Sequence, residues 1–156
     1  MSKYAYDILL EAQYRNLNTA DFPLGSFDLV INGEKKSDAH GKGYYAFINT
    51  VAGLTLRQYL INKATYCPKI FLVDTPLHGF DEGTTEQDQR SMQNGIFNYF
   101  INHASEGQII VMENEKNMPD IDFEALGINI VEFTNGIFKS KYKNTRNGFL
   151  ISVPGK

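Results

Sequence analysis

An apolar segment that ends in an aspartate is the part of this sequence best suited to chemistry. Residues 69–83, KIFLVDTPLHGFDEG, carry Asp74 directly after the apolar run Ile70–Val73, and two further carboxylates, Asp81 and Glu82, follow. A buried strand holds such a carboxylate rigidly, and a carboxylate placed there orients Mg²⁺, usually through water. Many strand-end aspartates instead cap the next helix. The pattern alone leaves both interpretations open.

A glycine-rich stretch is the second candidate. Gly41 and Gly43 let the backbone approach a phosphate closely, and a helix that starts there adds its dipole. A flexible loop before a helix is the alternative interpretation. The phosphate-binding sequence G-x-x-x-x-G-K-[ST] does not occur in the chain, because Tyr44 follows Gly41-Lys42-Gly43 where that loop needs Ser or Thr.

The segments around Asp74 predict how it is held. Ile70–Val73 and Gln108–Met112 are continuous apolar runs, which are typical of strands buried on both faces. Between them, apolar residues from Met92 to Ile101 recur at helical spacing. Two strands joined by one helix form a parallel βαβ unit, and ligands bind at the carboxyl ends of such strands, where Asp74 falls.

The other segments complete an α/β chain. Phe27–Ile31 alternates like a strand and ends at Asn32-Gly33, a strong turn signal. The remaining expected elements are helices over residues 3–15 and 44–66, a strand at 128–133, and a short strand at 149–153. The strand at 128–133 is followed by the turn signal Asn135-Gly136, so residues 138–142 are expected to pair back on it as a hairpin. We therefore expect one domain over residues 1–156, with a mainly parallel sheet flanked by helices and a β-hairpin near the C-terminus.

Four segments, in this order, resemble the C-terminal lobe of the ABC-type ATPase heads of SMC-like and RecN-like proteins. Residues 37–57 resemble the signature loop with its helix, 69–74 the Walker B strand, 77–83 the D-loop, and 107–114 the strand that leads to the switch residue. The resemblance covers nearly the whole chain. It implies the second half of a P-loop NTPase head, in DNA repair, chromosome maintenance or phage defence.

The resemblance also implies a composite Mg–ATP site. ATP and Mg²⁺ would be bound only in a complete head, whose P-loop-bearing lobe is the implied partner, and DNA would be reached through that complex. The implied site residues are Asp74 and Glu82 as catalytic residues, Asp74 as the metal ligand, and His40, Gly41, Lys42, Gly43, Asp81 and Glu113 toward the nucleotide.

The sequence departs from the family pattern at three positions. Thr75 stands where most such ATPases have a catalytic glutamate, and threonine is no general base at neutral pH, so Glu82 is the nearest substitute. Glu113, or Asn114 one residue on, replaces the switch histidine. The signature serine is matched by Ser37 or His40. With no P-loop, we expect a lobe that stands alone and does not hydrolyse ATP, whether from a split gene, a truncation or an excised fragment.

Two other function classes stay open. One is an interaction module that binds and regulates an intact ATPase, and the other is a Mg²⁺-dependent nuclease built on Asp74, Asp81 and Glu82. A net charge of -3 excludes a chain-wide basic field, although four basic residues between 139 and 146 could touch DNA phosphates. The single cysteine excludes an internal disulfide, and no apolar run is long enough to span a membrane, so we expect a cytoplasmic protein.

Overall fold

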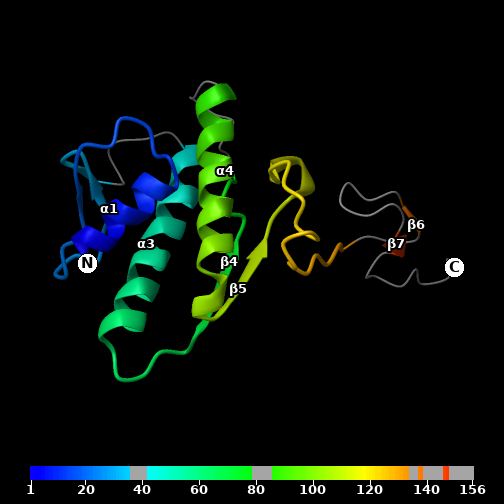
Figure 1. The fold of residues 1–156 in the computed structure, drawn as a ribbon. Helices are drawn as coiled ribbons and strands as arrows, with labels where there is room; N and C mark the ends of the chain where they lie inside the picture. The colour runs from blue at the N-terminus through cyan, green and yellow to red at the C-terminus, as the bar shows by residue number, and fades with distance from the viewer. Residues whose placement is uncertain (36–41, 79–85, 134–136, 139–145, 148–156) are drawn as a thin grey trace, which may run out of the picture. The chain divides into compact units, whose positions relative to one another are not determined.

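The computed structural model divides the chain into two compact units, residues 1–119 and 120–156, which are described separately. The described residues are 1–35, 42–78, 86–133, 137–138 and 146–147, and for residues 42, 43, 137, 138, 146 and 147 only the backbone is described. Figure 1 draws the elements and their labels. The expectation of a single domain over the whole chain remains a prediction.

Unit 1 is built on α1 (Ser2–Glu11), α3 (Lys42–Lys63) and α4 (Glu86–Asn102). Helix α1 packs against both α3 and α4 (Figure 1). It ends earlier than the predicted residue 15, because Gln13 adopts a φ of 56° and the N–H of Tyr14 bonds back to the carbonyl of Leu9 at 2.9 Å. This is a Schellman-type helix end made without the usual glycine, so no residue in the sequence indicates that the helix ends here. Helix α3 likewise ends at Lys63, before the predicted residue 66.

The core of unit 1 lies where these three helices meet. Fully buried side chains come from each of them: Ile8 and Leu9 from α1, Phe47, Ile48, Val51 and Leu54 from α3, and Met92 and Ile96 from α4. Gly95 lets α1 and α4 approach, since a Cβ there would lie 2.5 Å from the carbonyl carbon of Ala12. The helical layer is therefore closely packed.

The parallel βαβ unit is confirmed. Strands β4 (Ile70–Asp74) and β5 (Gln108–Met112) pair in parallel along their whole length, with Asp74 opposite Met112, and α4 forms the crossover between them. A short 3-10 helix, η1 (Ala104–Glu106), lies between α4 and β5, and another, η2 (Glu115–Asn117), follows β5.

The expectation that both strands are buried on both faces is wrong. Ile70 is 50% exposed and Leu72 59% exposed, whereas Val73 is buried. On the side of Phe71 lies α3, because a Cβ added to Gly53 would contact the Phe71 ring at 3.1 Å. Within the described residues, the sheet has only these two strands and the side of Ile70 and Leu72 stays open.

Antiparallel strands also occur, so the expected mainly parallel sheet is not what the described residues form. Strands β1 (Ala20–Asp21), β2 (Val30–Ile31) and β3 (Glu34–Lys35) make a small antiparallel sheet in that order. The predicted turn between β2 and β3 is confirmed: Asn32 and Gly33 have φ values of 54° and 84°, as a two-residue hairpin turn requires. The chain is an α/β protein, as expected.

Unit 2 departs from prediction in a strand and in its pairing. Residues 128–133 were expected to form a strand, but they are not assigned to one. Their apolar residues favour a strand, yet no partner strand among the described residues pairs with them. The expected hairpin, in which 138–142 pairs back on 128–133, is not formed by the described residues. A different hairpin is present: β6 (Ile137–Phe138) pairs antiparallel with β7 (Arg146–Asn147). The strand expected at 149–153 lies outside the described residues.

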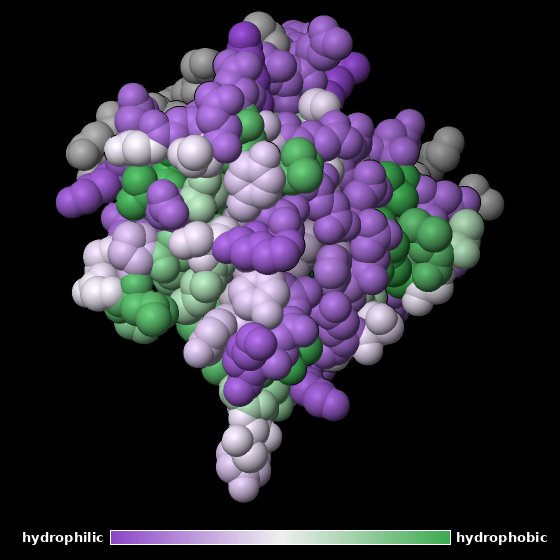
Figure 2. Space-filling model, turned by 60° about the vertical axis from the view of Figure 1, so that its left-hand side comes forward, coloured by the Kyte–Doolittle hydropathy of each residue, from purple (hydrophilic) through white to green (hydrophobic). Residues whose placement is uncertain are grey.

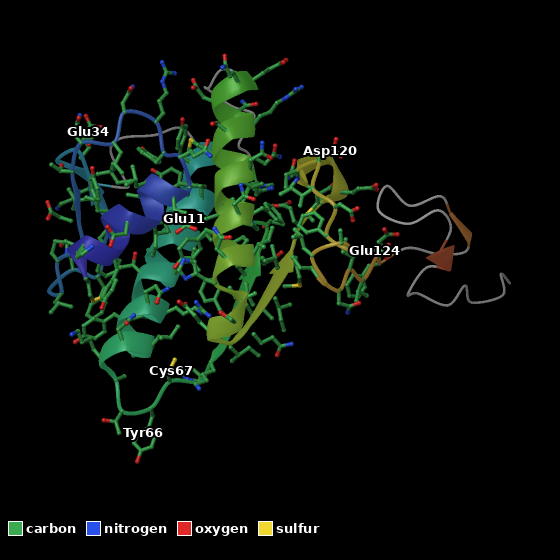
Figure 3. The ribbon with its side chains drawn as sticks, in the orientation of Figure 1. Glu11, Glu34, Tyr66, Cys67, Asp120 and Glu124 are labelled. Carbon is green, nitrogen blue, oxygen red and sulfur yellow. The ribbon has the colours of Figure 1, made fainter. Side chains whose placement is uncertain are left out.

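The surface of unit 1 combines polar and apolar areas. Figure 2 shows one side of the molecule, where apolar patches are separated by hydrophilic surface. The loop after α3 projects outward, and its Tyr66 is 88% exposed (Figure 3). None of the described helices has the length and apolar character needed to cross a membrane.

Candidate functional site

Asp74 is the last residue of β4, at the carboxyl end of the parallel strands, as predicted. Side chains alternate between the two faces of a strand, so Asp74 shares a face with Ile70 and Leu72. That face is the open one, and the aspartate itself is exposed. Its carboxylate is therefore available to a ligand that approaches the open face.

Thr75 leaves the strand in a strained conformation. Its φ is 47°, in the left-handed region that β-branched residues rarely adopt, and the following Pro76 further restricts the backbone before it. The N–H of Thr75 still donates to the carbonyl of Met112 at 2.8 Å, which extends the strand pairing by one residue. Strained backbone of this kind is concentrated at functional sites.

Glu113 lies at the same end of the sheet, where the resemblance implies the switch residue. Its Oε2 accepts a hydrogen bond from the N–H of Leu77 at 3.0 Å. Its Oε1 accepts from the N–H of Asn114 at 2.7 Å and from Nδ2 of Asn117 at 2.9 Å. The carboxylate thus ties the turn after β4 to the turn after β5. Both oxygens are engaged in holding the site together.

The remaining predicted residues are described only in part. Lys42 and Gly43 form the first turn of α3, so this helix begins two residues before the predicted 44, and their backbone N–H groups belong to its N-terminus. The other predicted positions, which are Ser37, His40, Gly41, Asp81 and Glu82, lie outside the described residues.

The described residues offer Mg²⁺ one carboxylate at this site. Among them, no group of three or more His, Cys, Asp or Glu side chains is arranged to hold a metal ion. Mg²⁺ usually keeps several waters and takes one or two protein carboxylates together with substrate phosphates. Asp74 therefore fits the role of a single protein ligand, but it does not form a metal site without a nucleotide.

A second polar cluster joins the helices, and the sequence interpretation missed it. His103, after α4, lies between two carboxylates: its Nδ1 is 3.0 Å from Glu106 Oε1, and its Nε2 is 3.4 Å from Glu11 Oε2. From α3, the buried Arg57 donates to Glu106 Oε2 at 3.2 Å, and Gln58 Nε2 donates to the same oxygen at 2.8 Å. These residues lie far apart in sequence and form no motif, so nothing local indicates the cluster.

Ionisation in this cluster is shifted by its surroundings. Burial, the largest single influence, raises the pKa of the Glu106 carboxyl, but His103, Gln58 and Arg57 together lower that pKa below its ordinary value. Burial also raises the pKa of Tyr99 to about 12, and the neighbouring Gln58 opposes part of that rise. The Tyr99 ring stacks on His103 with centroids 4.2 Å apart, and its buried hydroxyl makes no hydrogen bond of ordinary geometry.

No protein-family model matches the chain, and no curated protein shows significant sequence similarity to it.

Proposed function

We propose that the chain is the C-terminal lobe of an SMC-like ABC-type ATPase and contributes part of a composite Mg–ATP site. The observation that carries the proposal is the open apolar face of β4 and β5, with Asp74 at its carboxyl end. The resemblance of four sequence segments to such a lobe is independent support. The two together require a partner that covers the face and brings the phosphate-binding loop.

The open face is unusual for parallel strands. Parallel sheets are found almost only with both faces covered, and these strands are covered on the side of Phe71 and Val73. On the other side, Ile70, Leu72 and Met112 are between 40% and 59% exposed. Fully burying one such side chain is worth roughly 1.5–3 kcal/mol. A second layer on this face therefore gains hydrophobic free energy from side chains already in place.

The edges of the sheet favour the same partner. Within the described residues, β4 and β5 pair only with each other, so each strand has an outer edge that pairs with no described strand. Such an edge presents backbone N–H and C=O groups that a further strand can bind. A lobe that adds strands at one of these edges would widen the parallel sheet beside Asp74.

The site residues have separate roles under this proposal. Asp74 would hold Mg²⁺, which neutralises charge on the phosphates when it is bound. Glu113 keeps the turns after β4 and β5 together, so it positions Asp74 rather than touching the nucleotide. Thr75 contributes a hydroxyl group, but threonine is no general base at neutral pH. Because the chain has no phosphate-binding loop, we infer that it does not hydrolyse ATP by itself.

The test first establishes whether a neighbouring reading frame encodes a P-loop-bearing protein, and it then combines the full chain with that protein. Asp74→Asn should retain the complex but abolish ATP hydrolysis, whereas Leu72→Glu should abolish the complex. Leu10→Glu is the matched control, because Leu10 is also about 60% exposed but lies on α1. If the isolated chain hydrolyses ATP and Asp74→Asn removes that activity, the proposal that the chain has no complete ATP site of its own is refuted. A complex that survives Leu72→Glu would refute docking through this face.

A regulatory interaction module is the second candidate function. It is favoured by the hydrogen bonds that both Glu113 oxygens accept within the fold, since the carboxylate at the switch position then has a structural role that needs no nucleotide. The open apolar face could bind an intact ATPase whether the chain is a regulator or a catalytic lobe. In that case Leu72→Glu still abolishes the complex, but Asp74→Asn leaves both the complex and its ATPase activity unchanged.

A further inference from the structure

A series of hydrogen bonds connects α4 with the turn that follows Asp74. It begins at Gln93, a half-buried side chain of α4, whose Nε2 donates to the carbonyl oxygen of Asn117 in η2. Asn117 Nδ2 donates to Glu113 Oε1 at 2.9 Å, and Glu113 Oε2 accepts from the N–H of Leu77 at 3.0 Å. We call these four residues the Gln93 network. They come from three separate segments of unit 1, so the network is a tertiary contact.

The turn at the end of this network starts next to the metal-binding candidate. Thr75 follows Asp74 directly, and its carbonyl accepts from the N–H of His78 at 3.0 Å. Leu77 lies between Thr75 and His78 and is only 2% exposed, and the Glu113 carboxylate is the partner of its N–H. A buried N–H that loses its partner is costly. The path of the backbone that leaves Asp74 therefore depends on where the Glu113 carboxylate is held.

Helix α4 is fixed on another side by the N-terminal part of unit 1. Near the start of the helix, Asp88 pairs with Arg15 at 2.7 Å, and Ser91 Oγ donates to Gln13 Oε1 at 2.5 Å. Residues two apart on a helix point in nearly opposite directions, so Ser91 and Gln93 lie on opposite sides of α4. The helix is thus bonded to the segment after α1 on one side and to η2 on the other. A shift of α4 would reach the turn after β4 through Gln93.

We propose that Gln93 is a positioning residue for the Mg²⁺ site and couples the position of α4 to Asp74. The inference rests on the proposed function, in which Asp74 binds Mg²⁺ together with the phosphates. Gln93 holds Asn117, and the Asn117 amide holds the Glu113 carboxylate. That carboxylate fixes Leu77, so the backbone that leaves β4 keeps Asp74 in place. Contiguous hydrogen bonds of this kind carry coupling between distant elements. A partner that moves α4 would therefore change the Mg²⁺ affinity of the complete site.

The first experiment measures hydrogen exchange of the Leu77 N–H in the isolated full chain. Gln93→Met removes the donor and keeps a side chain of similar length, so it should speed this exchange about fivefold. The N–H of Leu54 on α3, which reports on global opening, should be unaffected. Gln93→Lys supplies an N–H donor again and should restore most of the protection. Gln87→Met is the matched control, because Gln87 is an exposed glutamine of the same helix.

A double variant distinguishes a network from independent packing effects. Asn117→Ala removes the link to Glu113 and should also speed the Leu77 exchange about fivefold. If Gln93 acts through Asn117, Gln93→Met should add less than about twofold to Asn117→Ala, whereas independent effects would multiply to about 25-fold. Multiplied effects, unchanged exchange in Gln93→Met or an equal effect of Gln87→Met would each overturn the inference.

The second experiment measures the Mg²⁺ requirement of ATP hydrolysis by the full chain combined with its P-loop-bearing partner. Gln93→Met should raise the Mg²⁺ concentration for half-maximal hydrolysis about threefold but leave the rate at saturating Mg²⁺ nearly unchanged. An unchanged Mg²⁺ requirement would overturn the coupling to Asp74. A wild-type complex without ATPase activity would refute the proposed function instead, and the Leu77 exchange would still decide whether Gln93 holds the turn.

Discussion

The two faces of strand β4 differ sharply although five consecutive residues build both. Phe71 lies against α3 and Val73 is buried on the same side of the strand, whereas Leu72, between them, is 59% exposed. Both faces carry large apolar side chains. The difference shows that apolar character alone does not decide burial. One side of the strand is already covered by the fold, whereas the open side is suited to a further layer.

The sharpest test compares a leucine of the packed helical core with the exposed leucine of β4. Leu54 on α3 is fully buried, so Leu54→Ala should lower the free energy of unfolding by about 2–5 kcal/mol. Leu72→Ala removes the same atoms from the open face and should cost less than about 1 kcal/mol. Urea unfolding of both variants measures the contrast. Equal losses would mean that the Leu72 face is covered in the folded chain.

A glycine pair tests how closely the packed side is fitted. A Cβ at Gly95 would lie 2.5 Å from backbone atoms of Ala12, so Gly95→Ala should push α1 from α4 and cost about 1–3 kcal/mol. Gly25 has no heavy atom within 4 Å of the same position, and Gly25→Ala should be neutral or slightly stabilising. Thermal unfolding followed by circular dichroism would show the difference. A harmless Gly95→Ala would disprove the close approach of the helices.

Glu113 tests the end of the sheet that carries Asp74, where its carboxylate joins the turns after β4 and β5. Glu113→Gln weakens up to three hydrogen bonds that join the turns after β4 and β5, so it should cost about 1–2 kcal/mol. Glu115→Gln changes an exposed neighbour and should have no measurable effect. Hydrogen exchange of the Leu77 N–H gives a local reading, which should speed up only in the Glu113 variant.

The smallest effect is expected at Thr75. A left-handed backbone costs a residue other than glycine roughly 1–2 kcal/mol, and glycine regains most of this while making the unfolded chain more flexible. Thr75→Gly should therefore leave the unfolding free energy unchanged or raise it by up to about 1 kcal/mol. Chemical denaturation with triplicate curves resolves a change of that size. A clear loss would contradict the strained conformation.

Local signals in the sequence predicted the elements that hold Asp74. The apolar run after Pro68, the helical spacing from Met92 onward and the apolar run Gln108–Met112 place β4, α4 and β5 in turn. The turn at Asn32-Gly33 was equally local. Asp74 was identified from its position at the end of an apolar run, and this position can be found without knowing any contact between distant residues.

What the sequence did not predict depends on contacts between distant residues. The exposure of Leu72 is set by which layers surround the strand, and an apolar run looks the same with one face covered or two. Residues 128–133 have the composition of a strand but form no ladder in the described chain. Glu113 bonds a group 36 residues away, and the His103 cluster joins three helices, so no sequence spacing reveals either.

The crossover between β4 and β5 has a consequence for how the chain folds. Parallel strands cannot form as a hairpin, so α4, 17 residues and about 25 Å long, must be in place before the strands can meet. Such long-range closure is slow, and the two apolar strands stay exposed until it is complete. Strand pairing is therefore expected to limit the refolding rate, and recovery of native protein after dilution from denaturant should fall as the chain concentration rises.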